Sequence, residues 1–97
     1  MRYIKNAKLV LETGILWDGV LAMDGDRIAA YGPVSEIEIP EDGEVIDAKG
    51  LYVGPGFVDI HVHGGGDAVF DQEPEKVVEF FLKNGTTTIL SGLSYNL

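Results

Sequence analysis

Apolar and polar residues alternate in short runs along the first half of the chain, which is typical of β-strands. The runs that predict strands cover residues 3–11, 19–23, 27–31 and 44–48. Between the second and third runs lies Asp24-Gly25-Asp26, where glycine favours a tight hairpin turn. Residues 1–53 therefore predict a small, mostly antiparallel β module. We expect its aromatic residues to belong to its core: Trp17, Tyr31 and Tyr52.

After residue 53 the pattern changes to a strict alternation between Phe57 and His63. Since side chains alternate across a strand, this run predicts an apolar face made of Val58, Ile60 and Val62. All of its ionisable groups fall on the opposite face: Asp59, His61 and His63. The sequence thus predicts a strand that separates apolar packing from polar chemistry.

A helix is predicted to begin at Pro74, which suits a first helical turn, and to end at Asn84-Gly85. Its broad apolar side is expected to cover the neighbouring strands with Val77, Val78, Phe81 and Leu82. The β-branched run Thr86–Leu90 predicts another strand. Residues 57–90 therefore predict a β-α-β unit with two parallel strands.

Two parallel strands cannot cover both faces of their sheet, and such sheets are found buried within larger α/β domains. We therefore expect the chain to be the beginning of a longer protein. The 97-residue chain itself is predicted to consist of two parts, residues 1–53 and residues 54–97. Apolar surface is expected to remain exposed on the second part.

His61 and His63 are the only histidines in the sequence, and they lie two residues apart on the predicted strand. This spacing brings both imidazoles to one face, close enough to bind one metal ion. They also lie at the carboxyl end of a parallel strand, where α/β proteins place their active sites. The alternative is a chance pair of exposed or hydrogen-bonded histidines.

Two neighbouring features could assist such a site. Asp59 lies on the same face, where its carboxylate could orient an imidazole; the alternative is a buried or turn-facing carboxylate. The glycines Gly64, Gly65 and Gly66 could present backbone N–H groups to a ligand. As a connector between strand and helix, the same glycines would need no ligand, and composition alone favours this interpretation.

The composition of the chain limits the binding partners and the metal ligands that we expect. Seven Lys and Arg against sixteen Asp and Glu give a net charge of −9, which repels nucleic acid. Without cysteine, a metal must be bound by His and carboxylate groups. The sequence has neither the apolar core of a signal peptide nor about 18 consecutive apolar residues, so we expect a cytoplasmic protein with no membrane partner.

The run from Pro55 to His63, PGFVDIHVH, resembles the P-G-F-[IV]-D-x-H-x-H signature of the metal-dependent amidohydrolases. The β module, with GDRI at residues 25–28 and VIDAKGLYV at residues 45–53, is similar to the N-terminal segment of that superfamily. HVHGGG at residues 61–66, followed by Asp71 and GTTTIL at residues 85–90, most resembles its N-acetylglucosamine-6-phosphate deacetylases. Leu-Ser-Gly at residues 90–92 departs from their common Leu-Pro-Thr.

This resemblance implies a mixed fold, in which the N-terminal half of a small β-sandwich precedes the first β-α-β unit of a (β/α)₈ TIM barrel. It implies that His61 and His63 bind a divalent metal ion. Zinc is the metal expected most, and iron, nickel and cobalt are the alternatives. In the family the metal polarises the amide carbonyl and activates water, and an Asp of the last barrel strand moves the proton. That Asp has no counterpart here, so we expect no catalytic residue within the chain and no activity from the chain alone.

The activity implied for the complete protein is hydrolysis of N-acetylglucosamine 6-phosphate to glucosamine 6-phosphate and acetate, in amino-sugar catabolism. Such an enzyme binds a small amino-sugar phosphate and is expected to form a homo-oligomer, a dimer. One alternative is another amidohydrolase, such as a deaminase or a cyclic-amide hydrolase. Another is a non-catalytic product that acts by association through its β module.

Overall fold

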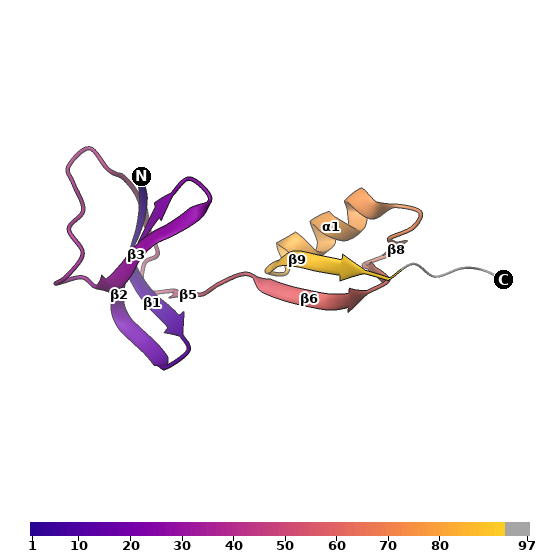
Figure 1. Ribbon diagram of the computed structural model, residues 1–97, viewed down its shortest axis with the longest axis horizontal. Coiled ribbons are helices and arrows are strands. Elements are labelled where there is room, and N and C mark those ends of the chain that lie inside the picture. Colours follow the sequence, from indigo (N-terminus) through magenta and orange to yellow (C-terminus); the bar gives the residue numbers. More distant parts are fainter. Residues whose placement is uncertain (93–97) are drawn as a thin grey trace. The chain divides into compact units, whose positions relative to one another are not determined.

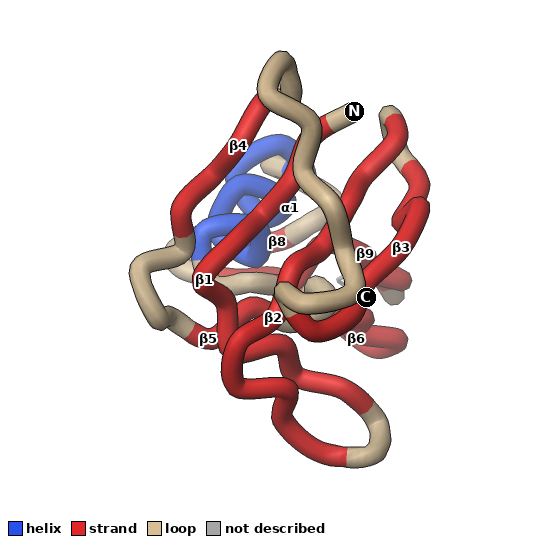
Figure 2. Tube along the Cα trace, turned by 90° about the vertical axis from the view of Figure 1, so that its left-hand side faces the viewer, coloured by secondary structure: helices blue, strands red, loops and turns tan. Residues whose placement is uncertain are grey.

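The structure, a computed structural model, describes residues 1–92 of the 97-residue chain. It divides into two compact units, Met1–Pro55 and Gly56–Leu97. Strands make up most of the first unit, and the second combines strands with the helix of the described residues (Figures 1 and 2). No helix in this part of the chain is long and apolar enough to cross a membrane.

The first unit is a five-stranded sheet. Its strands are β1 (Arg2–Leu11), β2 (Gly14–Asp24), β3 (Arg27–Pro33), β4 (Glu44–Asp47) and β5 (Tyr52–Val53). They follow the order β3-β2-β1-β4, and β5 also pairs with β1. The antiparallel β2–β3 hairpin confirms the prediction, whereas β2 starts earlier than expected.

The module is mostly antiparallel, as predicted, but the short strands β4 and β5 run parallel to β1, which was not predicted. The segment after β3 brings the chain back to the end of the sheet where β1 begins, so Glu44 pairs with Arg2. A parallel strand requires this long return, which a local pattern of alternating residues does not reveal.

Positive φ angles bend the first unit at a few defined positions. Asn6 has a φ of 53° within a register shift of β1, and its side chain donates to the Asp47 carboxylate at 3.0 Å. Lys49 (φ 54°) and Gly50 (φ 80°) form a tight turn closed by the Leu51 N–H on the Ala48 carbonyl. The Asn6 amide and the Lys49 backbone N–H both donate to Asp47 and lower its pKa.

The core of the first unit consists of two small clusters. Their buried members are Tyr3, Val20 and Ala22 in one, and Ala7, Leu9 and Ala48 in the other. The expectation that Trp17, Tyr31 and Tyr52 belong to this core is wrong, because these three side chains are exposed. The Lys8 ammonium lies over two of these rings, 5.5 Å from the centre of Trp17 and 5.0 Å from that of Tyr52. Hydrophobic character alone did not reveal which sheet face would be covered.

The second unit is a β-α-β unit with a small hairpin inserted before its helix. It comprises β6 (Phe57–Val62), β7 (Gly64–Gly65), β8 (Ala68–Val69), α1 (Pro74–Lys83) and β9 (Thr86–Ser91). β6 and β9 pair in parallel, as predicted, and Pro74 occupies the first turn of α1. The antiparallel β7–β8 pair was not predicted.

The helix packs against β7, β8 and β9 with a narrower face than expected. Val77 is fully buried, but Val78 and Leu82 remain 48% and 59% exposed, which corrects the prediction that both cover the strands. A two-stranded sheet is too narrow to cover an apolar arc of about 200° on a helix. On β6, Val62 is buried while Ile60 is 74% exposed.

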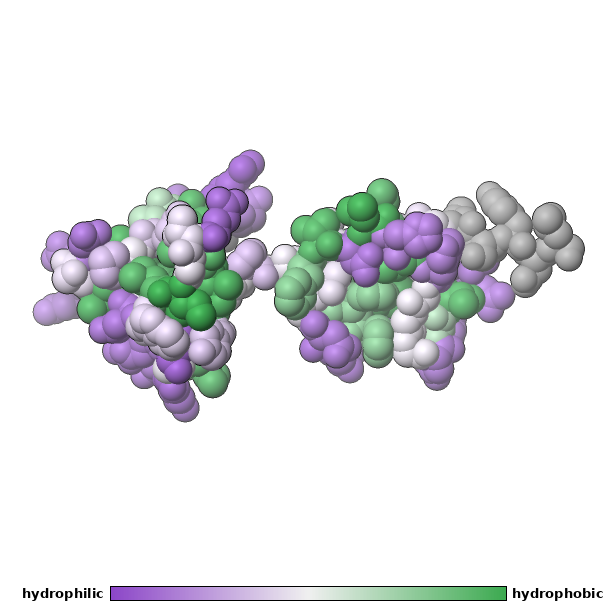
Figure 3. All heavy atoms as spheres, turned by 90° about the horizontal axis from the view of Figure 1, so that it is seen from below, coloured by the Kyte–Doolittle hydropathy of each residue, from purple (hydrophilic) through white to green (hydrophobic). Residues whose placement is uncertain are grey.

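Apolar surface therefore remains exposed on the second unit, as expected. Figure 3 shows apolar side chains at the surface of this unit. The large apolar residues of this unit that are more than half exposed are Phe57, Val58, Ile60, Leu82 and Leu90.

Candidate metal centre

The two histidines lie where β6 ends. His61 belongs to β6 and His63 follows it directly, beside the end of the parallel strand β9. Their Nε2 atoms are 3.0 Å apart, and their ring centres are 4.8 Å apart with the planes at 80°. The two imidazoles thus meet on one side of the strand, as their spacing predicts.

This geometry fits a shared metal ion. Two nitrogen ligands held at about 2.0–2.1 Å by one tetrahedral ion lie roughly 3.3–3.4 Å apart. The observed 3.0 Å between the Nε2 atoms of His61 and His63 differs by only a few tenths of an ångström. Both side chains are exposed, so an ion can reach them from solvent.

The pair supplies only part of a coordination sphere. Within residues 1–92, no group of three or more His, Cys, Asp or Glu side chains is arranged to bind a metal. A zinc ion takes four ligands, so further ligands would have to come from water or from groups beyond the described residues. Metal binding at His61 and His63 stays a prediction.

Gly92 contacts His63 and was not predicted as part of the site. The Nδ1 atom of His63 lies 2.8 Å from the Gly92 carbonyl oxygen. The Gly92 N–H in turn donates to the Val62 carbonyl at 2.9 Å. One indirect signal was available, because Gly92 directly follows β9, the strand that pairs with β6.

Asp59 lies one pleat before His61 on β6 and is half-buried. Its Oδ1 accepts a hydrogen bond from the His61 backbone N–H at 3.1 Å. This contact fixes the backbone that carries an imidazole. The predicted hydrogen bond from an imidazole to Asp59 stays a prediction.

The three glycines after His63 form a compact turn. Gly64 and Gly65 pair with Val69 and Ala68, and Gly66 has a φ of 64°. A Cβ added to Gly65 would lie 2.5 Å from Cδ1 of Phe80. Close packing on the helix therefore accounts for glycine here, which favours the connector interpretation, and a ligand-binding role stays a prediction.

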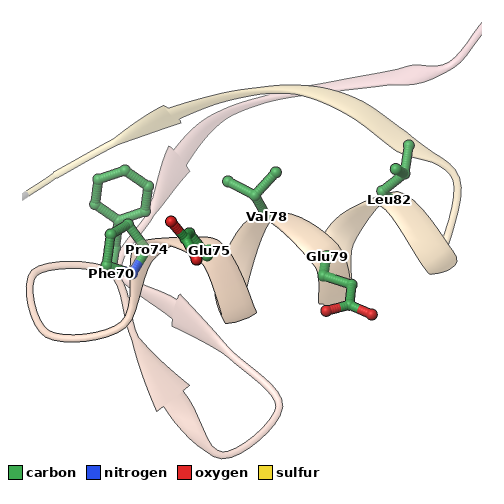
Figure 4. Close-up of a pocket in the computed structure, with 6 residues that line it drawn as sticks. All are labelled: Phe70, Pro74, Glu75, Val78, Glu79 and Leu82. Atoms are coloured by element: carbon green, nitrogen blue, oxygen red, sulfur yellow. The ribbon is translucent and has the colours of Figure 1, made fainter.

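Two hollows formed by described residues lie away from the histidines. One of them, of about 380 Å³, lies along α1, and Figure 4 shows the residues that line it: Phe70, Pro74, Glu75, Val78, Glu79 and Leu82. Another, of about 620 Å³, lies in the first unit and is lined mostly by apolar residues from several strands, including Leu9, Leu21 and Val53. Neither of these two hollows is lined by His61 or His63, whose side chains are exposed at the end of β6.

Comparisons with known proteins show which enzymes this chain is similar to. A dihydroorotase of Staphylococcus aureus (strain Mu50) is 47% identical over 64 residues, which is 65% of this chain. The solved N-acetylglucosamine-6-phosphate deacetylase of Pasteurella multocida matches 93% of the chain with a TM-score of 0.74 and 29% identity. The deacetylase of Mycobacterium smegmatis matches 94% with a TM-score of 0.65 and 26% identity. No family model matches.

These proteins are amidohydrolases, which confirms the resemblance found in the sequence. The chain, mostly strands with one helix in its described part, matches the N-terminal part of these enzymes. It spans 14% of the length of the dihydroorotase and 24% of the Pasteurella deacetylase.

Proposed function

We propose that this chain supplies the metal-binding N-terminal part of a metal-dependent hydrolase of amide C–N bonds. The observation that carries the proposal is the convergence of the His61 and His63 Nε2 atoms, 3.0 Å apart, at the carboxyl end of a parallel strand. Parallel strands present their active-site residues at this end. In this proposal β6, α1 and β9 form the first β-α-β unit of a (β/α)₈ barrel.

The two imidazoles would hold a divalent ion through their Nε2 atoms. When bound, such an ion polarises a carbonyl group and lowers the pKa of a bound water. Gly92 holds the His63 ring through Nδ1, and Asp59 holds the His61 backbone. Asp59 already accepts that backbone N–H, so it is better placed to support His61 than to move a substrate proton. We therefore assign the proton-transferring group to the remainder of the protein.

For the substrate, we propose N-acetylglucosamine 6-phosphate, which would yield acetate and glucosamine 6-phosphate. The support is the fold match over more than nine-tenths of the chain to two deacetylases with that name, at 29% and 26% identity. A second candidate is a cyclic amide. It is favoured by the higher identity, 47%, to a dihydroorotase over a shorter stretch.

The test is to express the complete gene product that contains this chain and to offer it both substrates. Acetate release from N-acetylglucosamine 6-phosphate supports the deacetylase, whereas ring opening of dihydroorotate supports the cyclic-amide hydrolase. Metal content is measured on the same preparation. Activity that survives complete removal of the metal would contradict the proposal.

The 97-residue chain is the matched control. Amide hydrolysis requires more metal ligands than two imidazoles, together with a positioned acid or base. We expect the chain alone to release no acetate. Turnover by the chain at the rate of the complete protein would place the catalytic groups among residues assigned here to structure.

A further inference from the structure

Gly92 is joined to the end of β6 by two hydrogen bonds. Its N–H donates to the Val62 carbonyl at 2.9 Å, and its own carbonyl lies 2.8 Å from Nδ1 of His63. The Ser91 hydroxyl adds a bond to the same Val62 carbonyl at 3.2 Å. The first bond joins Gly92 to the backbone of Val62, and the second joins it to the imidazole of His63.

The contact with a carbonyl fixes which nitrogen of His63 carries the proton. A carbonyl oxygen only accepts hydrogen bonds, so Nδ1 of His63 must be the donor. In a neutral ring the other nitrogen, Nε2, then keeps its lone pair. Metal-binding imidazoles are commonly oriented in this way, with the non-ligating nitrogen donating to a backbone carbonyl.

The proton of His61 follows from the contact between the two rings. The two Nε2 atoms are 3.0 Å apart, and since the Nε2 of a neutral His63 accepts, the Nε2 of His61 must donate. A metal ion bound by both Nε2 atoms would replace this shared proton. His61 would pass it to solvent and take one up at Nδ1, so that two neutral rings bind without a net change in protons.

Gly92 also leaves the space that the ring occupies. A Cβ at this position would lie 2.9 Å from Cε1 and 3.4 Å from Nδ1 of His63. Gly92 is not one of the described glycines that have a positive, left-handed φ. Its φ angle is therefore one that other L residues also adopt. The requirement for glycine comes from the imidazole.

We infer that Gly92 is a positioning residue for the metal centre, where its carbonyl fixes the Nδ1–H tautomer of His63 and its missing side chain makes room for the ring. This inference rests on the proposed metal-binding function. It does not depend on the substrate.

The test uses the 97-residue chain with ¹⁵N-labelled histidine, under conditions in which both rings are neutral. Long-range ¹H–¹⁵N spectra without metal are expected to show the Nδ1–H tautomer for His63 and the Nε2–H tautomer for His61. Zinc affinity is then measured by titration calorimetry. Gly92→Ala is expected to lose the tautomer preference of His63 and to weaken zinc binding by about 10–100-fold, the usual effect of removing such an orienting contact.

Two control variants separate the ring contact from general effects. Gly32→Ala introduces a Cβ whose nearest neighbour, on Ile37, is at an ordinary 3.5 Å, so zinc binding should be unchanged. Ser91→Ala removes a hydroxyl but keeps the Gly92 carbonyl, so the His63 tautomer should persist. Backbone spectra show whether each variant is folded.

The two proposals fail in different ways. A wild-type chain that binds no zinc overturns metal binding, and the role of Gly92 with it. Zinc binding combined with an Nε2–H tautomer of His63, or with unchanged tautomer and affinity in Gly92→Ala, overturns only the role of Gly92. The wild-type tautomer gives this answer even if Gly92→Ala does not fold.

Discussion

The two units of the chain are both rich in strands, but they use their side chains differently. The first unit contains most of the buried hydrophobic residues, gathered in two clusters around β1. The second buries few side chains, chiefly Val62, Ala68 and Val77, yet it holds both histidines. We therefore expect the first unit to depend on its buried clusters, whereas the second unit carries the proposed metal site at an exposed strand end.

The strongest test of this comparison is the double variant His61→Ala/His63→Ala. We expect zinc affinity to fall by at least about 100-fold, because both imidazole ligands are removed. Titration calorimetry measures the loss. Glu75→Ala/Glu79→Ala, which removes two exposed carboxylates from α1, is the control and should bind zinc like the wild type. Retained affinity in the histidine variant would show that acidic groups bind the ion and would break the comparison.

A second test compares two valines that are both fully buried, Val20 in the first unit and Val77 in the second. Each Val→Ala change should lower the free energy of unfolding by about 2 kcal/mol, from lost burial and a small cavity. Amide exchange read separately in each unit measures the effect. We expect Val77→Ala to abolish protection in α1 and Val20→Ala to leave measurable protection in β1 and β2. Equal residual protection would mean that both units have comparable cores.

The sequence predicted those features that depend on neighbouring residues. Glycine at position 25 marked the β2–β3 hairpin, and Pro74 marked the start of α1. The spacing of His61 and His63 likewise placed their rings together, because side chains two apart share a strand face.

The parallel β6–β9 pair was predicted because it follows from the β-α-β order, but other features that depend on distant segments were not. The parallel pairing of β4 with β1 requires knowledge of where the chain returns, 42 positions after Arg2 in the case of Glu44. The contact between Gly92 and His63 spans 29 positions and arises only when β9 pairs with β6. The exposure of Trp17 depends on which face of the sheet its neighbours cover.

A third test concerns the glycines after His63. Gly65→Ala should lower the free energy of unfolding of the second unit by about 1–3 kcal/mol, because the new Cβ would lie 2.5 Å from Phe80. Gly54→Ala is the control, since its Cβ would meet Val10 at 3.4 Å, an ordinary contact. Thermal unfolding and amide exchange measure both. Unchanged stability of Gly65→Ala would contradict the connector interpretation and favour a ligand-binding loop.

The smallest expected effect is a gain in stability of the first unit from Lys49→Asn. Lys49 has a φ of 54°, a left-handed conformation that is unfavourable for most side chains and that asparagine tolerates better. Asn-Gly is also the preferred pair for a turn with two positive φ angles, and Gly50 already follows. The hydrogen bond from the residue 49 N–H to Asp47 uses the backbone and is kept. We expect a gain of about 0.5 kcal/mol in thermal unfolding.

Lys5→Asn is the matched control, because it removes the same charge from β1, where asparagine is disfavoured and no positive φ is relieved. It should not stabilise the protein. Both lysines attract the Asp47 carboxylate electrostatically and lower its pKa. If the two variants lower the free energy of unfolding equally, the attraction between lysine and Asp47 outweighs the strain of the turn at residue 49. The stability of the first unit then depends on exposed charges as well as on its buried clusters.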